Sequence, residues 1–260
     1  MKSTPDFLLE RFVHQLLSHD THACRRLFND ALNAGMDAQW MLSEILWPAT
    51  ECVQQLRQDG SLSLRTFNHS IRTIAELASR LAPVLARDGR PANVTARNLF
   101  IISAPGEPSD SGAHLLTLLA ESHGFTVFFA GAHLTTDELL FALTQIQPDA
   151  LVIHGSLPSS LPATLTFLEK LKKANFWPQV QTAITGAMLS DKPCGADLRS
   201  RHPVELLELL ALCPDHRATS KKQNTPHADA LSLNVESKPD AVIRDLMFRY
   251  FPPRTSPHGI

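Results

Sequence analysis

The stretch APGEPSDSG, residues 104–112, carries the residue types best suited to holding a polar ligand. It follows a short apolar run and precedes a helical pattern, so its small residues would place backbone N–H groups at the start of a helix. Such a turn suits an anion or the polar edge of a ligand. Its candidate contacts are Glu107, Ser109 and Asp110, with Gly112 at the start of the helix.

The 12 histidines raise the question of a metal site. Most of them fall on polar helix faces, in turns or near the end of the chain, where we expect them to be solvated. Three are better placed: His154 ends an apolar run, His133 follows another, and His69 lies on a helix that could face a cleft. Because a neutral imidazole nitrogen is a good ligand for cobalt or iron, these three are the candidate metal ligands.

The sequence does not contain the motifs of several common enzyme classes. It has no G-x-S-x-G nucleophile elbow, no P-loop and no G-x-G-x-x-G turn. Its 4 cysteines stand far apart without a C-x-x-C pair, which indicates neither a zinc ribbon nor a disulfide framework. We therefore expect a protein that is not an enzyme.

The charge balance argues against direct nucleic-acid binding. With 24 Lys and Arg against 26 Asp and Glu, the formal net charge is -2, so no surplus of positive charge exists to neutralise phosphates. No apolar run approaches the roughly 18 residues of a membrane span, and the polar start of the chain is not a signal peptide. The expectation is a cytoplasmic protein that contacts neither nucleic acid nor membrane.

The elements that must position these residues form two patterns. Through residues 5–88, apolar side chains recur at helical spacing and predict four helices in an antiparallel cap bundle. The third helix is expected from about Ala38 to Leu56, with a kink at Pro48.

From residue 97 the period changes. Short apolar runs at 98–103, 125–129, 150–153, 180–184 and 196–198 alternate with helical patterns at 112–122, 136–145, 161–173 and 203–211. This alternation predicts an α/β domain over residues 97–213, with a flavodoxin-like, doubly wound parallel sheet. Ligands bind such sheets at the carboxyl ends of the strands. Residues 214–260 are polar and predict a mostly disordered tail with a short amphipathic helix.

A helical cap followed by a flavodoxin-like domain resembles the cobalamin (B12)-binding module of methionine synthase, corrinoid carriers and B12-dependent regulators. The resemblance covers roughly residues 5–212. Its landmarks in the cap are LLSHD at 16–20, ALNAG at 31–35 and WPA at 47–49, and those in the α/β domain are GE at 106–107, DSG at 110–112, HGFTV at 123–127 and GAD at 195–197.

The ligand motifs of this family are altered here. The cobalt-ligating motif is Asp-x-His-x-x-Gly, and Glu107, Ser109 and Gly112 stand in its places, without the histidine. A hydroxyl is a poor substitute for imidazole at cobalt. The resemblance therefore implies that Ser109 does not ligate a metal and that an axial nitrogen would come from one of the three candidate histidines.

The two motifs that meet the nucleotide tail of cobalamin are also altered. The serine of the second motif falls at His154 or, with a shift of two residues, at Ser156. The double glycine of the third motif is Thr185-Gly186, where the added side chain should crowd the channel of the tail. These differences disfavour a cobalamin whose nucleotide tail is inserted into the domain.

The cap segment RQDGSLSLRTF, residues 57–67, is closer to a regulatory subgroup of the family. That subgroup includes the tetrapyrrole-responsive antirepressors of purple bacteria. The resemblance implies a sensor that acts in transcription regulation through a protein partner, such as a transcription regulator, without its own DNA-binding domain. The alternatives are a corrinoid carrier subunit of a methyltransferase and a ligand-free scaffold. The residues leave open whether cobalamin, haem or nothing is bound, and they do not define the oligomeric state.

Together these features predict a cleft between the cap and the carboxyl edge of the sheet. The candidate ligand contacts are Glu107, Ser109, Asp110, Gly112, His154, Ser156, Thr185, Gly186 and, from above, His69. The candidate metal ligands are His154, His69 and His133.

Overall fold

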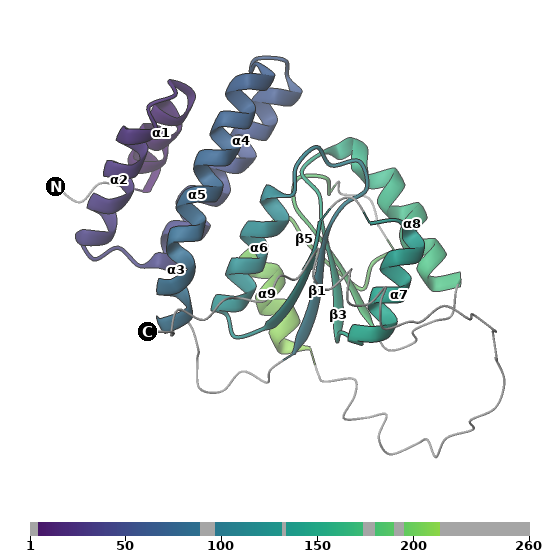
Figure 1. Ribbon diagram of the computed structural model, residues 1–260. Helices are drawn as coiled ribbons and strands as arrows, with labels where there is room; N and C mark the ends of the chain where they lie inside the picture. The colour runs from purple at the N-terminus through teal and green to yellow at the C-terminus, as the bar shows by residue number, and fades with distance from the viewer. Residues whose placement is uncertain (1–4, 89–96, 132–133, 174–179, 190–194, 214–260) are drawn as a thin grey trace, which may run out of the picture. The chain divides into compact units, whose positions relative to one another are not determined.

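The computed structural model describes residues 5–88, 97–131, 134–173, 180–189 and 195–213 (Figure 1). The tail expected at 214–260 lies outside the described residues. In the part of the chain that is described, no helix is both long and apolar enough to cross a membrane.

The first described segment is helical, and its helix ends follow the polar and glycine breaks of the sequence. The Asp20 carboxylate accepts a hydrogen bond from the Ala23 N–H, 2.8 Å away, and caps the second helix, while Gly35 follows that helix with a φ of +83°. The helices are α1 (Pro5–Leu17), α2 (Thr21–Asn33), α3 (Ala38–Met41), η1 (Leu42–Leu46), α4 (Trp47–Gln58) and α5 (Leu64–Asp88).

The third expected helix is divided rather than simply kinked. It consists of α3, the π-helical turn η1 and α4, and Pro48 lies in the first turn of α4. A proline there lacks the N–H that would continue the α-helical ladder, and the wider π turn accommodates this break. Hydrophobic spacing persists through the whole segment, which is why the sequence predicted one continuous helix.

The second part is a five-stranded parallel sheet in the order β2-β1-β3-β4-β5, which is the order of flavodoxin-like sheets. The strands are β1 (Asn98–Ser103), β2 (Thr126–Ala130), β3 (Ala150–His154), β4 (Gln181–Thr185) and β5 (Leu198–Ser200). The helices between them are α6 (Ser111–Ser122), α7 (Thr136–Ile146), α8 (Leu161–Lys173), preceded by the short turn η2 (Pro158–Ser160), and α9 (Pro203–Leu212). The predicted fold class is confirmed.

Helices cover both faces of the sheet, with α6 and α9 on one side and α7 and α8 on the other (Figure 1). The apolar cluster on the α6 side continues into the helical segment and includes Leu77 and Leu81 of α5 with Leu115 and Leu119 of α6. All the described residues belong to one compact unit. The cap and the sheet are therefore packed through a shared core, which fixes how the cap meets the strand ends.

Candidate functional site

Three polar residues end adjacent strands at the carboxyl edge of the sheet. Ser103 of β1 pairs in register with His154 of β3, which pairs with Thr185 of β4. All three are buried, with exposed fractions of 5%, 5% and 0%. Ser103 Oγ, His154 Nδ1 and Thr185 Oγ1 have no hydrogen-bond partner among the described residues. Because buried polar atoms are nearly always paired, these three mark a place for polar atoms of a ligand or for water.

The His154 ring fills the space between two glycines. A Cβ atom at Gly112 would lie 2.6 Å from His154 Cδ2 and closer still to Nε2, and one at Gly186 would lie 2.7 Å from His154 Nδ1. Gly186 also has a φ of +103°, which favours glycine. A larger side chain at either position would clash with the imidazole, so both positions require glycine.

Burial lowers the pKa of His154 to about 4, and an interaction with the Thr185 backbone opposes this shift. The cause is the loss of hydration that a charged imidazolium would suffer inside the domain. His154 is consequently neutral at physiological pH. Nε2 lies beside the Gly112 backbone and Nδ1 beside the Gly186 backbone, so both nitrogens are next to the domain's own chain.

Trp47 of the cap lies against the His154 ring. The ring centroids are 5.1 Å apart and the planes are tilted by 50°. Trp47 Nε1 also donates to Glu51 Oε1 at 3.0 Å, which fixes the direction of the indole. A second cap residue, Gln58, donates from Nε2 to the Ser156 carbonyl oxygen at 3.2 Å. The cap thus covers the carboxyl end of β3 directly.

Glu107 joins the loop after β1 to the loop after β3. Its carboxylate accepts hydrogen bonds from the N–H of Ser156 at 2.9 Å and of Leu157 at 3.0 Å, and a third from the Ser156 hydroxyl. Glu107 and Ser156 are both buried. We call this carboxylate with its three donors the Glu107 clamp; it closes the loops over the strand ends.

Ser109 and Asp110 serve the start of α6. Ser109 Oγ donates to Ser111 Oγ at 3.1 Å and accepts from the Ser111 N–H at 3.2 Å. Asp110 occupies the N-cap position of α6, although its side chain does not cap the helix. The Ser109 hydroxyl is thus used locally, at the start of α6.

The expected histidine above the cleft is placed elsewhere. His69 Nε2 lies 3.1 Å from Thr21 Oγ1, and its ring is stacked on His19 with centroids 4.6 Å apart, so the side chain faces α2. It does not join His154, because the α5 face that carries it packs against α2. His133 lies outside the described residues. Within the described ranges, no three His, Cys, Asp or Glu side chains are grouped to hold a metal ion.

Two residues of the site were not predicted as contacts, Trp47 and Gln58. Trp47 appeared only as part of the cap landmark WPA at 47–49, and this match is the sequence signal that could have singled it out. A small cavity of about 230 Å³ near the ends of β1 and β2 was also missed; Ser103, Gly131 and Thr135 are among its lining residues.

These residues allow a test of whether cobalamin fits. The three unpaired polar atoms at the strand ends suit the amide-bearing rim of a corrin ring. The space between Gly112 and Gly186 does not suit an inserted nucleotide tail, because the His154 ring fills it. Ser109 cannot replace an axial imidazole. The site is therefore compatible with the ring of the cofactor and incompatible with a buried tail.

Comparison with known proteins agrees with this architecture. Residues 8–65 match the sequence family described as the B12 binding domain. Monomethylamine corrinoid protein 1 of Methanosarcina mazei is 19% identical over 203 residues, covering 76% of this chain and 93% of that protein. Monomethylamine corrinoid protein 2 of Methanosarcina acetivorans is 18% identical over the same length and the same shares of both chains.

Among solved structures, the monomethylamine corrinoid protein of Methanosarcina barkeri has the same fold. The TM-score is 0.67 at 18% sequence identity, and the match covers 80% of this chain and 99% of that one. This chain thus shares the fold of that protein, a helical cap followed by a Rossmann-like α/β domain.

Proposed function

We propose that this protein binds a corrinoid between its helical cap and the carboxyl edge of its sheet, and presents it to a partner protein. The observation that supports this most is the position of Trp47. It belongs to the cap segment that matches the B12 binding domain, and it lies over the unpaired polar residue His154.

A carrier role is favoured over the regulatory role suggested by the cap segment at residues 57–67. The relatives described above are named corrinoid proteins, and their similarity extends over both parts of this chain. They favour a corrinoid over haem and give no support to a transcription regulator as partner. The proposed partner is a methyltransferase that acts on the carried cofactor, and the chain itself would not be the catalyst.

The proposed binding mode leaves the nucleotide tail outside the sheet domain. The neutral His154 ring fills the space between Gly112 and Gly186 where a tail would enter, and its nitrogens lie beside the backbones of these two glycines. A metal-ligating role for His154 is therefore less consistent with its orientation than a space-filling role. The nitrogen below the cobalt would then be that of the cofactor's own base.

Binding requires the cap and the strand ends to separate. The Trp47 ring and the Gln58 amide both contact the loop region that a corrin ring would cover. These contacts are few and neutral, so a ring that buries comparable apolar area can replace them. The unpaired Ser103 and Thr185 hydroxyls would gain partners on the rim of the ring.

The proposal is tested by titrating the purified protein with hydroxocobalamin and with cobinamide, which lacks the nucleotide tail. We expect dissociation constants that agree within about threefold, because an external tail makes few contacts with the protein. Calorimetry or equilibrium dialysis gives both values, with haemin as the control for a generic tetrapyrrole. A preference of more than about tenfold for cobalamin would indicate an inserted tail. Binding of neither compound would identify a ligand-free scaffold and reject the proposal.

A further inference from the structure

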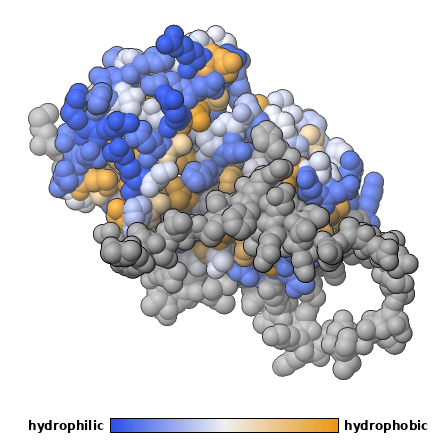
Figure 2. Space-filling model, in the orientation of Figure 1, coloured by the Kyte–Doolittle hydropathy of each residue, from blue (hydrophilic) through white to orange (hydrophobic). Residues whose placement is uncertain are grey.

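A second polar groove lies on the helical part of the chain, between α2 and α5. Its volume is about 580 Å³. An adjoining groove of about 530 Å³ shares His19, His69 and Arg72 with it. Together the two are lined by His19, Asp20, Thr21, His22, Arg25, Arg65, Asn68, His69, Arg72, Thr73 and Glu76. None of these residues belongs to the strand-end site, and the visible face of the helical part is largely hydrophilic (Figure 2).

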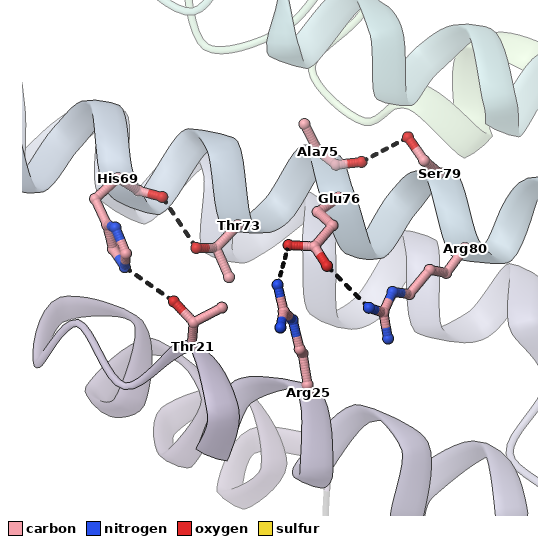
Figure 3. Close-up of polar contacts among 8 residues, drawn as sticks. All are labelled: Thr21, Arg25, His69, Thr73, Ala75, Glu76, Ser79 and Arg80. Carbon is pink, nitrogen blue, oxygen red and sulfur yellow. Dashed lines mark hydrogen bonds and ion pairs between the residues drawn. The ribbon is translucent and has the colours of Figure 1, made fainter.

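The acidic residues of this groove are already engaged. Glu76 accepts from Arg25 at 2.7 Å and from Arg80 at 2.9 Å, as Figure 3 shows. The Asp20 carboxylate accepts a hydrogen bond from the Ala23 N–H and caps α2. Within the described residues, neither Arg65 nor Arg72 forms an ion pair. Two exposed guanidinium groups therefore border the groove without a carboxylate to neutralise them.

Hydrogen-bond donors for an anion come from the histidines beside the start of α2. The helix begins at Thr21 next to His69 (Figure 3), and the Asp20 carboxylate caps it by accepting from the Ala23 N–H. The rings of His19 and His69 have centroids 4.6 Å apart and planes tilted by 33°, and His22 lines the same groove. An anion placed here would meet two guanidinium groups and three imidazoles.

From this arrangement we infer a binding site for the phosphate group of a small phosphomonoester. Arginine pairs well with the oxygens of a phosphate, and imidazole N–H groups can donate to the same oxygens. The volume of each groove is in the range of small-molecule sites, which favours a metabolite-sized ligand over a protein surface. This site would bind a second ligand, separately from the corrinoid at the strand ends.

The protonation state of His69 should depend on whether an anion is bound in the groove. Partial burial, His19, Arg72 and Arg65 lower the pKa of His69, which favours the neutral imidazole. The other charged groups that face it are His22, Arg25, Asp20 and Glu76. A bound dianion offsets the positive neighbours and raises the pKa of His69. Binding then takes up a proton, and affinity rises as the pH falls.

The test titrates the full chain with inorganic phosphate. Binding is monitored through the imidazole resonances in NMR spectra. We expect saturable shifts of His19 and His69 beyond those caused by chloride at equal ionic strength. Arg72→Gln should weaken binding at least about fivefold, since it removes a direct charge. The matched control is Arg26→Gln, an exposed arginine of α2 outside both grooves, which should change affinity less than about twofold.

The pH arm uses sulfate, whose charge is constant in the range studied. Affinity should be at least about threefold higher near pH 6 than near pH 8, and His69→Gln should remove most of this dependence. If the two arginine variants weakened phosphate binding equally, the binding would come from general electrostatic attraction, and the proposed site would be wrong. Shifts no larger than those with chloride, or tighter binding of a glutamate-rich peptide than of phosphate, would also overturn it.

Discussion

The double variant Ser109→His with His154→Ser is expected to bind cobalamin in a different mode from the unaltered protein. The serine empties the space between Gly112 and Gly186 that the imidazole fills, and the histidine supplies the nitrogen that the loop after β1 lacks. The nucleotide tail can then enter the domain. We expect an absorption spectrum of the base-off type and an affinity at least about tenfold higher than for cobinamide.

The single variants are the controls for this exchange. With Ser109→His alone, His154 still fills the channel, so the spectrum of bound cobalamin should remain that of the unaltered protein. With His154→Ser alone, the channel opens without a new ligand, and the spectrum should not show a protein nitrogen. If the folded double variant bound cobalamin and cobinamide equally, His154 would not be what excludes the tail.

Replacing Glu107 with alanine is expected to cost the fold on the order of 3–4 kcal/mol. The variant leaves the buried N–H groups of Ser156 and Leu157, and the Ser156 hydroxyl, without the carboxylate that accepts from them. An unpaired buried donor costs about 1–3 kcal/mol. For a chain of this length the loss corresponds to a decrease of about 10 °C in the thermal midpoint, measured by calorimetry or circular dichroism.

Glu107→Gln is the matched variant for the clamp. Its carbonyl oxygen can still accept from a backbone N–H, and its amide can donate to Ser156 Oγ, so we expect less than half of the destabilisation. Equal losses for both variants would mean that the charge, rather than the set of hydrogen bonds, holds the loops. A loss below about 1 kcal/mol for the alanine variant would show that the clamp does not stabilise the strand ends.

Much of the fold could be predicted because hydrophobic periodicity is a local property. The strand expected at 98–103 coincides with β1, and the expected helix at 161–173 coincides with α8. The helix expected from Ala38 to Leu56 was divided at η1, since π-helical turns leave the apolar spacing almost unchanged. Spacing alone therefore does not distinguish a continuous helix from an interrupted one.

The site could be predicted only in part. The rule that ligands bind at strand ends identified His154, Ser156 and Thr185 correctly as neighbours at one edge, and the structure places them at the ends of β3 and β4. The same reasoning could not find the contact of Trp47 with His154, or the turn of His69 toward Thr21. Both depend on how the cap packs against the rest of the chain, which is a long-range property.

The measurement that tests the central claim most directly is electron paramagnetic resonance of the protein with reduced cobalamin, using 15N-labelled protein and unlabelled cofactor. A nitrogen bound to Co(II) splits the cobalt lines into triplets if it is 14N and into doublets if it is 15N. Because the His154 ring fills the space between Gly112 and Gly186 where a tail would enter, we predict triplets, which assign the axial nitrogen to the cofactor's own base. Doublets would assign it to a histidine of the protein and contradict the proposed binding mode.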